Sequence, residues 1–207
     1  MARERVVPSR VLERAEQRRL IAHEIVARLE ILDRWAVFGV PTLVGAVAYG
    51  LIVAPDIDME IHCAEPTVDA GFAVMREIAP LPGVWRVRFS NELDAPDQGL
   101  YWQIRYRLEP AGDPWKLDMW LLAHDHPGPK AIEIVEEMRR ALTDETRAAV
   151  LEIKEAVVGS GVRSIDVYRA VLDDAVRTPG EFLVWHERNA STGLLDWHPR
   201  EGRGADG

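Results

Sequence analysis

The segment that most constrains the fold is a run of uncharged residues early in the chain. Residues 35–55 include no charged side chain over twenty-one positions, which is long enough for a helix to cross a bilayer. Glycine and proline interrupt this run at four positions: Gly39, Pro41, Gly45 and Gly50. Such residues are typical of strand ends and turns. We therefore expect no membrane span, but an extended segment over residues 41–45, a glycine turn, and a short buried helix over residues 46–53.

Residues 56–63 (DIDMEIHC) follow this run and alternate between polar and apolar side chains. A period of two predicts a strand with one polar and one buried face. The polar set is Asp56, Asp58, Glu60 and His62, and the apolar set is Ile57, Met59, Ile61 and Cys63. Alternate residues of a strand lie roughly 7 Å apart at Cβ, so Asp56 and Asp58 can converge on one or two divalent cations. The alternative is the solvated face of an edge strand.

A third carboxylate, Asp118, lies in a second alternating segment, residues 115–122 (WKLDMWLL), where Lys116 shares its face. Burying an unpaired charge in the middle of a strand is costly, so Asp118 needs a cation or a metal ion. If the two strands are neighbours, Asp56, Asp58 and Asp118 form an acidic triad on one surface of a sheet. The alternative for Asp118 is a structural ion pair with Lys116 or an arginine.

The remaining sequence predicts the α+β class: a small mixed sheet with flanking helices, followed by a C-terminal helical bundle. Helices are expected over residues 9–34, with Ser9 as the N-cap, and over residues 67–79. Further strands are expected over residues 84–89 and 100–108, and four helices after residue 128, the third of them capped by Ser164. The expected units are residues 1–127, a helical domain at 128–190 and a mobile tail at 191–207.

Composition narrows the class of protein. The 207 residues are 47% hydrophobic, which is enough for a core, and the net charge of −9 disfavours a long nucleic acid as partner. The same charge favours a cationic or neutral small molecule as the group that would accept a transferred moiety. The sequence leaves the oligomeric state open. The single cysteine, Cys63, excludes an intramolecular disulfide and a four-cysteine zinc site. We expect a cytoplasmic protein that binds no membrane.

An acidic triad of this kind suits phosphoryl or nucleotidyl transfer. Two Mg²⁺ ions held by shared carboxylates stabilise the attacking and the leaving oxygen together. Mg²⁺ prefers a few carboxylates together with waters and substrate phosphates. The backbone N–H groups at the start of the helix after Gly45 would bind a triphosphate, and a closely approaching backbone there favours glycine.

The glycine turn, the short helix, the strand with paired aspartates and the later strand aspartate together resemble the nucleotidyltransferase fold of the DNA polymerase beta superfamily. The closer resemblance is to its small bacterial minimal and antibiotic-modifying members, and it covers about residues 36–122. The family usually places a helical substrate-binding region next, as residues 128–190 would supply. In this family the turn glycine is typically followed by serine or glycine, whereas here Ala46 follows Gly45 and one phosphate contact is lost.

The resemblance implies roles for individual residues. Asp56 and Asp58 match the metal-binding pair, and Asp118 matches the third carboxylate, which binds metal or activates the acceptor hydroxyl. On the nucleotide side we expect contacts from Gly45, Ala46 and Tyr49, with packing as the alternative for Tyr49. The implied activity is the Mg²⁺-dependent transfer of a nucleotidyl group from a nucleoside triphosphate to a small-molecule or protein acceptor. The alternatives are a catalytically silent binding protein of the same fold and a metal-dependent phosphohydrolase.

Several other residues keep two interpretations at this point. Glu60 and His62 are more suited to the rim of the metal site than to ligation. Paired arginines on two strands suit either a triphosphate or acidic substrate, or a solvated face: Arg86 with Arg88, and Arg105 with Arg107. Strand tryptophans either stack on a base or belong to the core: Trp102, Trp115 and Trp120. The pair His124 and His126 resembles a hydrolase metal motif but lies in a loop, and Cys63 is expected to be an inert core thiol.

Overall fold

The computed structural model describes residues 10–193 and 195–200, and eight helices and five strands lie within them. The strands are β1 (Val40–Val44), β2 (Asp56–Cys63), β3 (Val84–Asn91), β4 (Leu100–Tyr106) and β5 (Trp115–Ala123). The helices are α1 (Arg10–Arg28), α2 (Ile31–Ala36), α3 (Gly45–Tyr49), α4 (Val68–Ile78), α5 (Val135–Ala141), α6 (Asp144–Val157), α7 (Ser164–Leu172) and α8 (Pro179–Asn189). The predicted α+β class is confirmed.

The five strands form one mixed sheet in the order β1-β2-β5-β4-β3. Strands β2 and β5 run parallel at its centre, and every other neighbouring pair is antiparallel. In this register Asp58 lies directly opposite Asp118. The two strands that carry the candidate carboxylates are therefore neighbours, as the triad requires.

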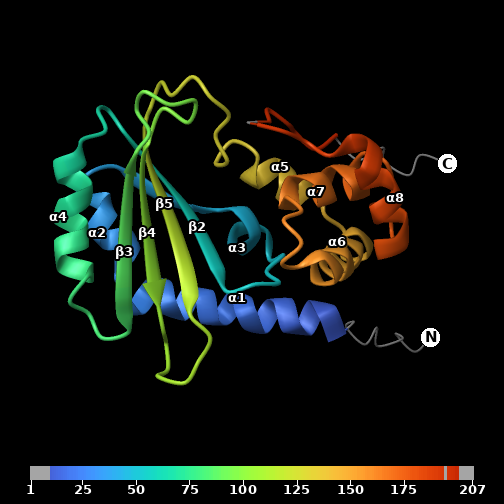
Figure 1. Cartoon of the computed structure of the whole chain (residues 1–207), viewed down its shortest axis with the longest axis horizontal. Coiled ribbons are helices and arrows are strands. Elements are labelled where there is room, and N and C mark those ends of the chain that lie inside the picture. Colours follow the sequence, from blue (N-terminus) through green and yellow to red (C-terminus); the bar gives the residue numbers. More distant parts are fainter. Residues whose placement is uncertain (1–9, 194, 201–207) are drawn as a thin grey trace, which may run out of the picture.

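The two faces of the sheet have different covers (Figure 1). Helices α2 and α4 and the C-terminal half of α1 pack on the apolar face, where Trp35 and Trp102 meet edge to face with ring centroids 5.7 Å apart. Helix α3 and the C-terminal helices α5–α8 lie on the other side of β2. None of the helices within the described residues combines the length and apolar character that a bilayer span needs.

The N-terminal helical segment is broken, which corrects the expectation of one helix over residues 9–34. Glu30 has a left-handed backbone with φ 48°, and α2 starts in a new direction directly after it. The break allows Leu29 and Ile31, on either side of it, both to be buried, and the Arg34 side chain donates a 3.0 Å hydrogen bond to the Leu29 carbonyl. The expected cap, Ser9, lies outside the described residues.

Helix α1 belongs to two hydrophobic clusters. Its C-terminal half, with Ala22 and Ile25, packs beneath the sheet, whereas Val11 and Ala15 pack among the C-terminal helices. One helix thus contributes to both cores. The expected division of the chain at residue 127 stays a prediction. Helix α1 thus connects the sheet to the helical region.

The C-terminal part differs from expectation in two details. Arg163, and not Ser164, occupies the N-cap position of α7. The tail expected from residue 191 packs back on the helices over its described part: Trp197 Nε1 donates to Asp173 at 2.7 Å, and His198 Nδ1 lies 2.7 Å from a carboxylate oxygen of Glu137. These aromatic and ionic contacts hold residues 197–198 against α5 and the end of α7.

A glycine in α4 allows a first test of the packing. A Cβ atom on Gly71 would lie 2.1 Å from Cζ2 of Trp102, whose side chain is fully buried. We expect Gly71→Ala to lower the free energy of unfolding by about 1–3 kcal/mol, the usual cost of overpacking a core, as measured by urea denaturation. The control is Gly180→Ala in α8, where a Cβ would meet nothing within 4 Å. Equal stability of the two variants would contradict this packing.

Candidate active site

Three aspartates from two neighbouring strands converge on the polar face of the sheet. One carboxylate oxygen from each of Asp56, Asp58 and Asp118 lies within 4.8 Å of the other two. Among residues 10–193 and 195–200, this is the one group of three or more side chains with the ligand types and spacing for a metal ion. The predicted triad is therefore present in space.

Gly45 closes one side of the triad. Strand β1 pairs with β2 so that Val44 lies opposite Asp58, and α3 begins at the next residue. Gly45 has φ 62°, and a Cβ atom there would lie 2.6 Å from Oδ2 of Asp58. Only glycine satisfies both the left-handed backbone and the close approach of the carboxylate. The turn and the metal-binding pair thus form one local unit.

Lys116 neutralises part of the triad. Its Nζ lies 2.9 Å from Oδ2 of Asp56 and 2.6 Å from Oδ2 of Asp118. Although burial opposes the charged form, hydrogen bonds to both carboxylates raise the pKa of Lys116, which keeps its ammonium group protonated. The ion pair considered for Asp118 and the acidic triad therefore exist together.

The second oxygen of Asp118 is fixed by strand β4. The Tyr101 hydroxyl donates to Oδ1 at 2.7 Å, and the Gln103 amide donates to the same oxygen at 3.1 Å. Both donors come from the strand that pairs with β5, where Gln103 lies directly opposite Asp118. Asp118 is thus the most firmly oriented carboxylate of the three.

The electrostatics of the triad fit a divalent cation. Burial raises the pKa of Asp58 to about 7, with repulsion from Asp56 and Asp118 adding to the effect. Burial also raises the pKa of Asp56. Oδ1 of Asp56 is buried and has no hydrogen-bond partner among the described residues, and buried polar atoms normally have one. Hard oxygen donors, uncompensated negative charge and a free ligand atom are what Mg²⁺ requires.

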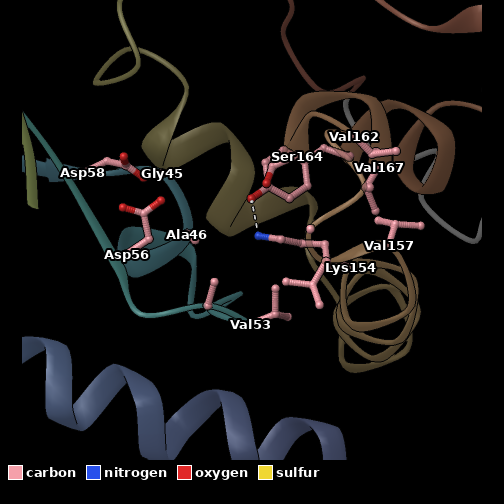
Figure 2. Close-up of a pocket in the computed structure, with 14 residues that line it drawn as sticks. Gly45, Ala46, Val53, Asp56, Asp58, Lys154, Val157, Val162, Ser164 and Val167 are labelled. Carbon is pink, nitrogen blue, oxygen red and sulfur yellow. Dashed lines mark hydrogen bonds between the residues drawn. The ribbon is translucent and has the colours of Figure 1, made fainter. Parts of the chain in front are cut away.

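Two carboxylates of the triad, Asp56 and Asp58, line one end of a cleft of about 250 Å³ between the sheet and the helical region, and Asp118 lies beside them. Figure 2 shows the two walls: Asp56, Asp58, Gly45 and Ala46 on one side, and Lys154, Ser164 and several valines of α6 and α7 on the other. One wall is therefore anionic at its end, and the other is mainly apolar with a single buried amine.

Lys154 is a site residue that the sequence interpretation missed. Its Nζ donates to the Leu51 carbonyl at 2.9 Å and to the Tyr168 hydroxyl at 3.3 Å. Burial lowers the pKa of Lys154 to about 8, although the nearby Asp58 and Asp56 oppose that shift. A signal was available, because Lys154 falls within the apolar stripe of Val150, Ile153 and Val157, where a solvent-facing lysine is not expected.

Tyr49 does not line the cleft, which corrects its expected place beside the nucleotide. It is the last residue of α3 and only 3% exposed, and its ring packs edge to face against Tyr168 with centroids 5.9 Å apart. Packing, the alternative for this residue, is what the structure shows. Gly45 and Ala46 do line the cleft.

Glu60 and His62 serve the connection between the two parts of the chain rather than the triad. The Glu60 carboxylate accepts hydrogen bonds from the backbone N–H groups of Ala131 and Ile132 at 2.7 and 3.1 Å, and His62 Nε2 lies 3.1 Å from it. Glu60 thereby fixes the segment that leads into α5.

The tryptophans and histidines considered as site residues lie in different parts of the structure. Trp102 and Trp115 are core residues, whereas Trp120 lies on the face of Asp118, its ring centroid 4.9 Å from that of Tyr101. His126 is buried beside Glu60 and Trp120, and His124 is exposed, so the two histidines do not form a metal pair with the triad. The free thiol of Cys63 is buried, as expected.

Comparisons with known proteins place the fold. No protein-family model matches the sequence. A search of the curated proteins also gives no match. Solved structures do match.

One such structure is a Cid1 poly(U) polymerase mutant bound to MgATP, which matches 75% of this chain and 50% of its own at 12% identity, with a TM-score of 0.57. A cytoplasmic RNA terminal U-transferase matches 78% and 53% at 12% identity, with a TM-score of 0.52. A further Cid1 structure matches 80% and 54% at 13% identity, with a TM-score of 0.51. The chain therefore has the expected nucleotidyltransferase fold and spans about half the length of these proteins.

The position of Lys116 predicts an effect on metal affinity. Its ammonium group pairs with two of the carboxylates that would bind a divalent cation. Lys116→Met therefore removes a competitor of the cation. We expect this variant to bind Mg²⁺ about tenfold more tightly in calorimetry, given the strength of a charge pair at this distance, and to melt at a lower temperature without Mg²⁺. Lys130→Met, which lies away from the triad, is the control. Weaker Mg²⁺ binding by Lys116→Met would contradict the proposed competition.

The raised pKa of Asp58 predicts how stability depends on pH without metal. The folded state holds a proton on this carboxyl up to about pH 7, whereas the unfolded chain loses it near its ordinary pKa of 3.8. Its contribution to stability is therefore complete below pH 3.8 and is lost as the pH rises through 7. Asp58→Asn should flatten this loss and melt above the wild type at pH 8, whereas Asp113→Asn in an exposed loop should leave the profile unchanged.

Proposed function

We propose that the protein transfers a nucleotidyl group from a nucleoside triphosphate to a hydroxyl of a small-molecule acceptor, with Mg²⁺ as cofactor. The observation that carries this proposal is the convergence of Asp56, Asp58 and Asp118 beside the Gly45 turn, where Asp56 and Asp58 line one end of a cleft. The three carboxylates would hold two Mg²⁺ ions. When bound, these ions supply charge stabilisation to the attacking and the leaving oxygen.

The triphosphate is assigned to the cleft between the Gly45 turn and the opposite wall. The backbone around Gly45 and Ala46 faces this space on one side, and Lys154 faces it on the other. Ala46 offers no hydroxyl, but Ser164 lines the same cleft and carries one. Lys154 and Ser164 would thus supply side-chain donors to phosphate oxygens where the turn supplies only backbone donors.

In the proposed reaction, the acceptor hydroxyl oxygen forms a bond to the α-phosphorus. The bond from the α-phosphorus to the bridging oxygen breaks, and pyrophosphate leaves with the bonding electron pair. Asp118 is placed to take the proton of the acceptor hydroxyl, because Tyr101, Gln103 and Lys116 hold its carboxylate in one orientation.

A small acceptor agrees with the charge of the protein. The neighbours named above are a poly(U) polymerase and an RNA terminal U-transferase, but this chain spans only about half their length and has a net charge of −9. An extended electrostatic contact with nucleic acid is disfavoured by that charge. A protein hydroxyl would accept the nucleotidyl group by the same chemistry. The free buried thiol of Cys63 suits a reducing compartment, and we propose the cytoplasm.

A catalytically silent protein of the same fold is the second candidate. Two observations favour it: Ala46 weakens the phosphate turn, and the Lys116 ammonium already pairs with two of the three carboxylates. Product analysis separates the candidates, because transfer releases pyrophosphate, a phosphohydrolase releases phosphate from the triphosphate, and a silent protein releases neither.

The test of the proposed site is nucleotide binding by Asp58→Asn. Loss of this carboxylate removes a shared ligand, so we expect Mg²⁺-dependent binding of ATP or UTP, measured by calorimetry, to fall at least about a hundredfold, with the circular dichroism spectrum retained. Asp113→Asn serves as the matched control. Unchanged nucleotide binding by Asp58→Asn would show that the site is assigned wrongly, and no thermal shift of the wild type with any Mg²⁺-nucleotide would favour a protein that does not use nucleotides.

A further inference from the structure

The polar face of the sheet continues beyond the triad onto strands β4 and β3, where it becomes basic. In the observed register Arg88 lies opposite Gln103, which lies opposite Asp118. Arg105 lies opposite Lys116 on one side and opposite Arg86 on the other. Arg86, Arg88 and Arg105, called here the arginine strip, therefore share the face of the candidate carboxylates.

The positive charges of the arginine strip are not paired with carboxylates of the described residues. Within residues 10–193 and 195–200, no carboxylate lies within 4.0 Å of these guanidinium groups, whereas most arginines of the N-terminal helices pair with a glutamate. Arg86 and Arg88 are exposed. The Arg86 guanidinium stacks at 4.8 Å over the ring of Trp85, a contact that orients it without cancelling its charge. An unneutralised basic strip in a chain of net charge −9 is a local reversal of sign.

The arginine strip is near enough to serve the same reaction. Neighbouring strands are roughly 4.8 Å apart, and alternate residues of one strand are roughly 7 Å apart. The backbone of Arg105 is therefore one strand across from Asp118 and two residues along, and the backbone of Arg88 is two strands across from Asp118. An anion held by the arginine strip would lie one small molecule away from the carboxylates.

The surface beside the arginine strip and the triad suits the body of an acceptor, because Trp120 and Tyr101 lie in the next row across the sheet. Trp120 and Tyr101 are adjacent on this face, with ring centroids 4.9 Å apart, and both are partly exposed. Next to them the Gln103 amide and the Tyr101 hydroxyl point at Asp118. Aromatic rings beside polar groups are typical of sites that bind sugars or other ring compounds.

We propose that the acceptor is a small phosphomonoester with a free hydroxyl, whose phosphate binds the arginine strip while its hydroxyl lies at Asp118. This inference rests on the proposed function and names its acceptor class. Three arginines match the charge of a dianionic phosphate, because guanidinium groups bind phosphate oxygens in pairs. The strip extends over roughly 7 Å along β3 and one strand spacing across, which fits one phosphate group and not a long phosphate backbone.

The inference replaces the expectation of a cationic or neutral acceptor, because that expectation came from net charge. The chemistry of transfer is unchanged: the acceptor hydroxyl oxygen bonds to the α-phosphorus, its proton passes to Asp118, and pyrophosphate leaves with the bonding electrons. The phosphate of the acceptor takes no part in bond making and only fixes the position of the molecule.

The test uses acceptors in matched pairs with and without a phosphate: ribose and ribose 5-phosphate, glycerol and glycerol 3-phosphate, glucose and glucose 6-phosphate. Kanamycin represents a cationic acceptor and a ten-residue uridine oligonucleotide represents RNA. Transfer from labelled ATP and UTP with Mg²⁺ is measured on the full chain. We expect kcat/KM for the phosphorylated member of each pair to be at least tenfold greater than for its neutral partner. It should also be at least tenfold greater than for kanamycin or the oligonucleotide.

Variants connect this preference to the arginine strip. Arg88→Ala and Arg105→Ala should each raise KM for the phosphorylated acceptor about tenfold with little change in kcat, and Arg105→Lys should restore part of the loss. Arg76→Ala is the control, since Arg76 is exposed on α4, which covers the opposite face of the sheet. A melting curve for each variant shows that it is folded.

The outcomes distinguish this inference from the proposed function. Equal or better transfer to neutral sugars, kanamycin or the oligonucleotide would overturn the inference, as would an unchanged KM in both Arg88→Ala and Arg105→Ala. Mg²⁺-dependent nucleotide binding without transfer to any phosphorylated compound would also count against it, while leaving the nucleotide site standing. Absence of nucleotide binding in the wild type would refute the proposed function itself.

Discussion

The parallel pairing of β2 with β5 is the constraint on which the rest of the site depends. It places Asp58 opposite Asp118 and Asp56 opposite Lys116, so that three carboxylates and one ammonium group occupy a small area of the sheet. Like charges at this separation destabilise the fold unless a cation joins them. Lys116 supplies part of that charge, and the unpartnered oxygen of Asp56 marks where the compensation is incomplete.

The cleft depends on two connections between the sheet and the helical region. Helix α1 contributes to both hydrophobic clusters, and the Glu60 carboxylate holds the backbone at residues 131–132. Arg14 of α1 also donates to Glu155 of α6 at 3.0 Å, next to the buried Lys154. The position of Lys154 opposite the triad is therefore a consequence of how the helical region is attached, and the two walls of the cleft form a single packing unit.

The parts of this site that could be predicted from the sequence are those with a local cause. Alternation over residues 56–63 identifies the face of Asp56 and Asp58, and a charged residue in the middle of strand 115–122 indicates Asp118. Gly45 is recognisable because a glycine before a short helix is a local signal. The break at Glu30 has no such signal, since it results from burying the residues on both of its sides. The contact of Tyr49 with Tyr168 could not be predicted, because helical position alone does not say which neighbour a ring contacts.

The arginine strip shows why net charge is a poor guide to what a site binds. The chain carries 34 acidic and 25 basic residues, but exposed acids of the helices pair with arginines along the same surface and leave little field at a distance. The register of β3 on β4 and of β4 on β5 brings the arginine strip to the face of Asp118, and the sequence alone does not reveal this placement. The local sign of charge on this face is therefore set by strand pairing, within one or two strand spacings of the carboxylates, and an acidic chain would present a cationic surface to the proposed acceptor.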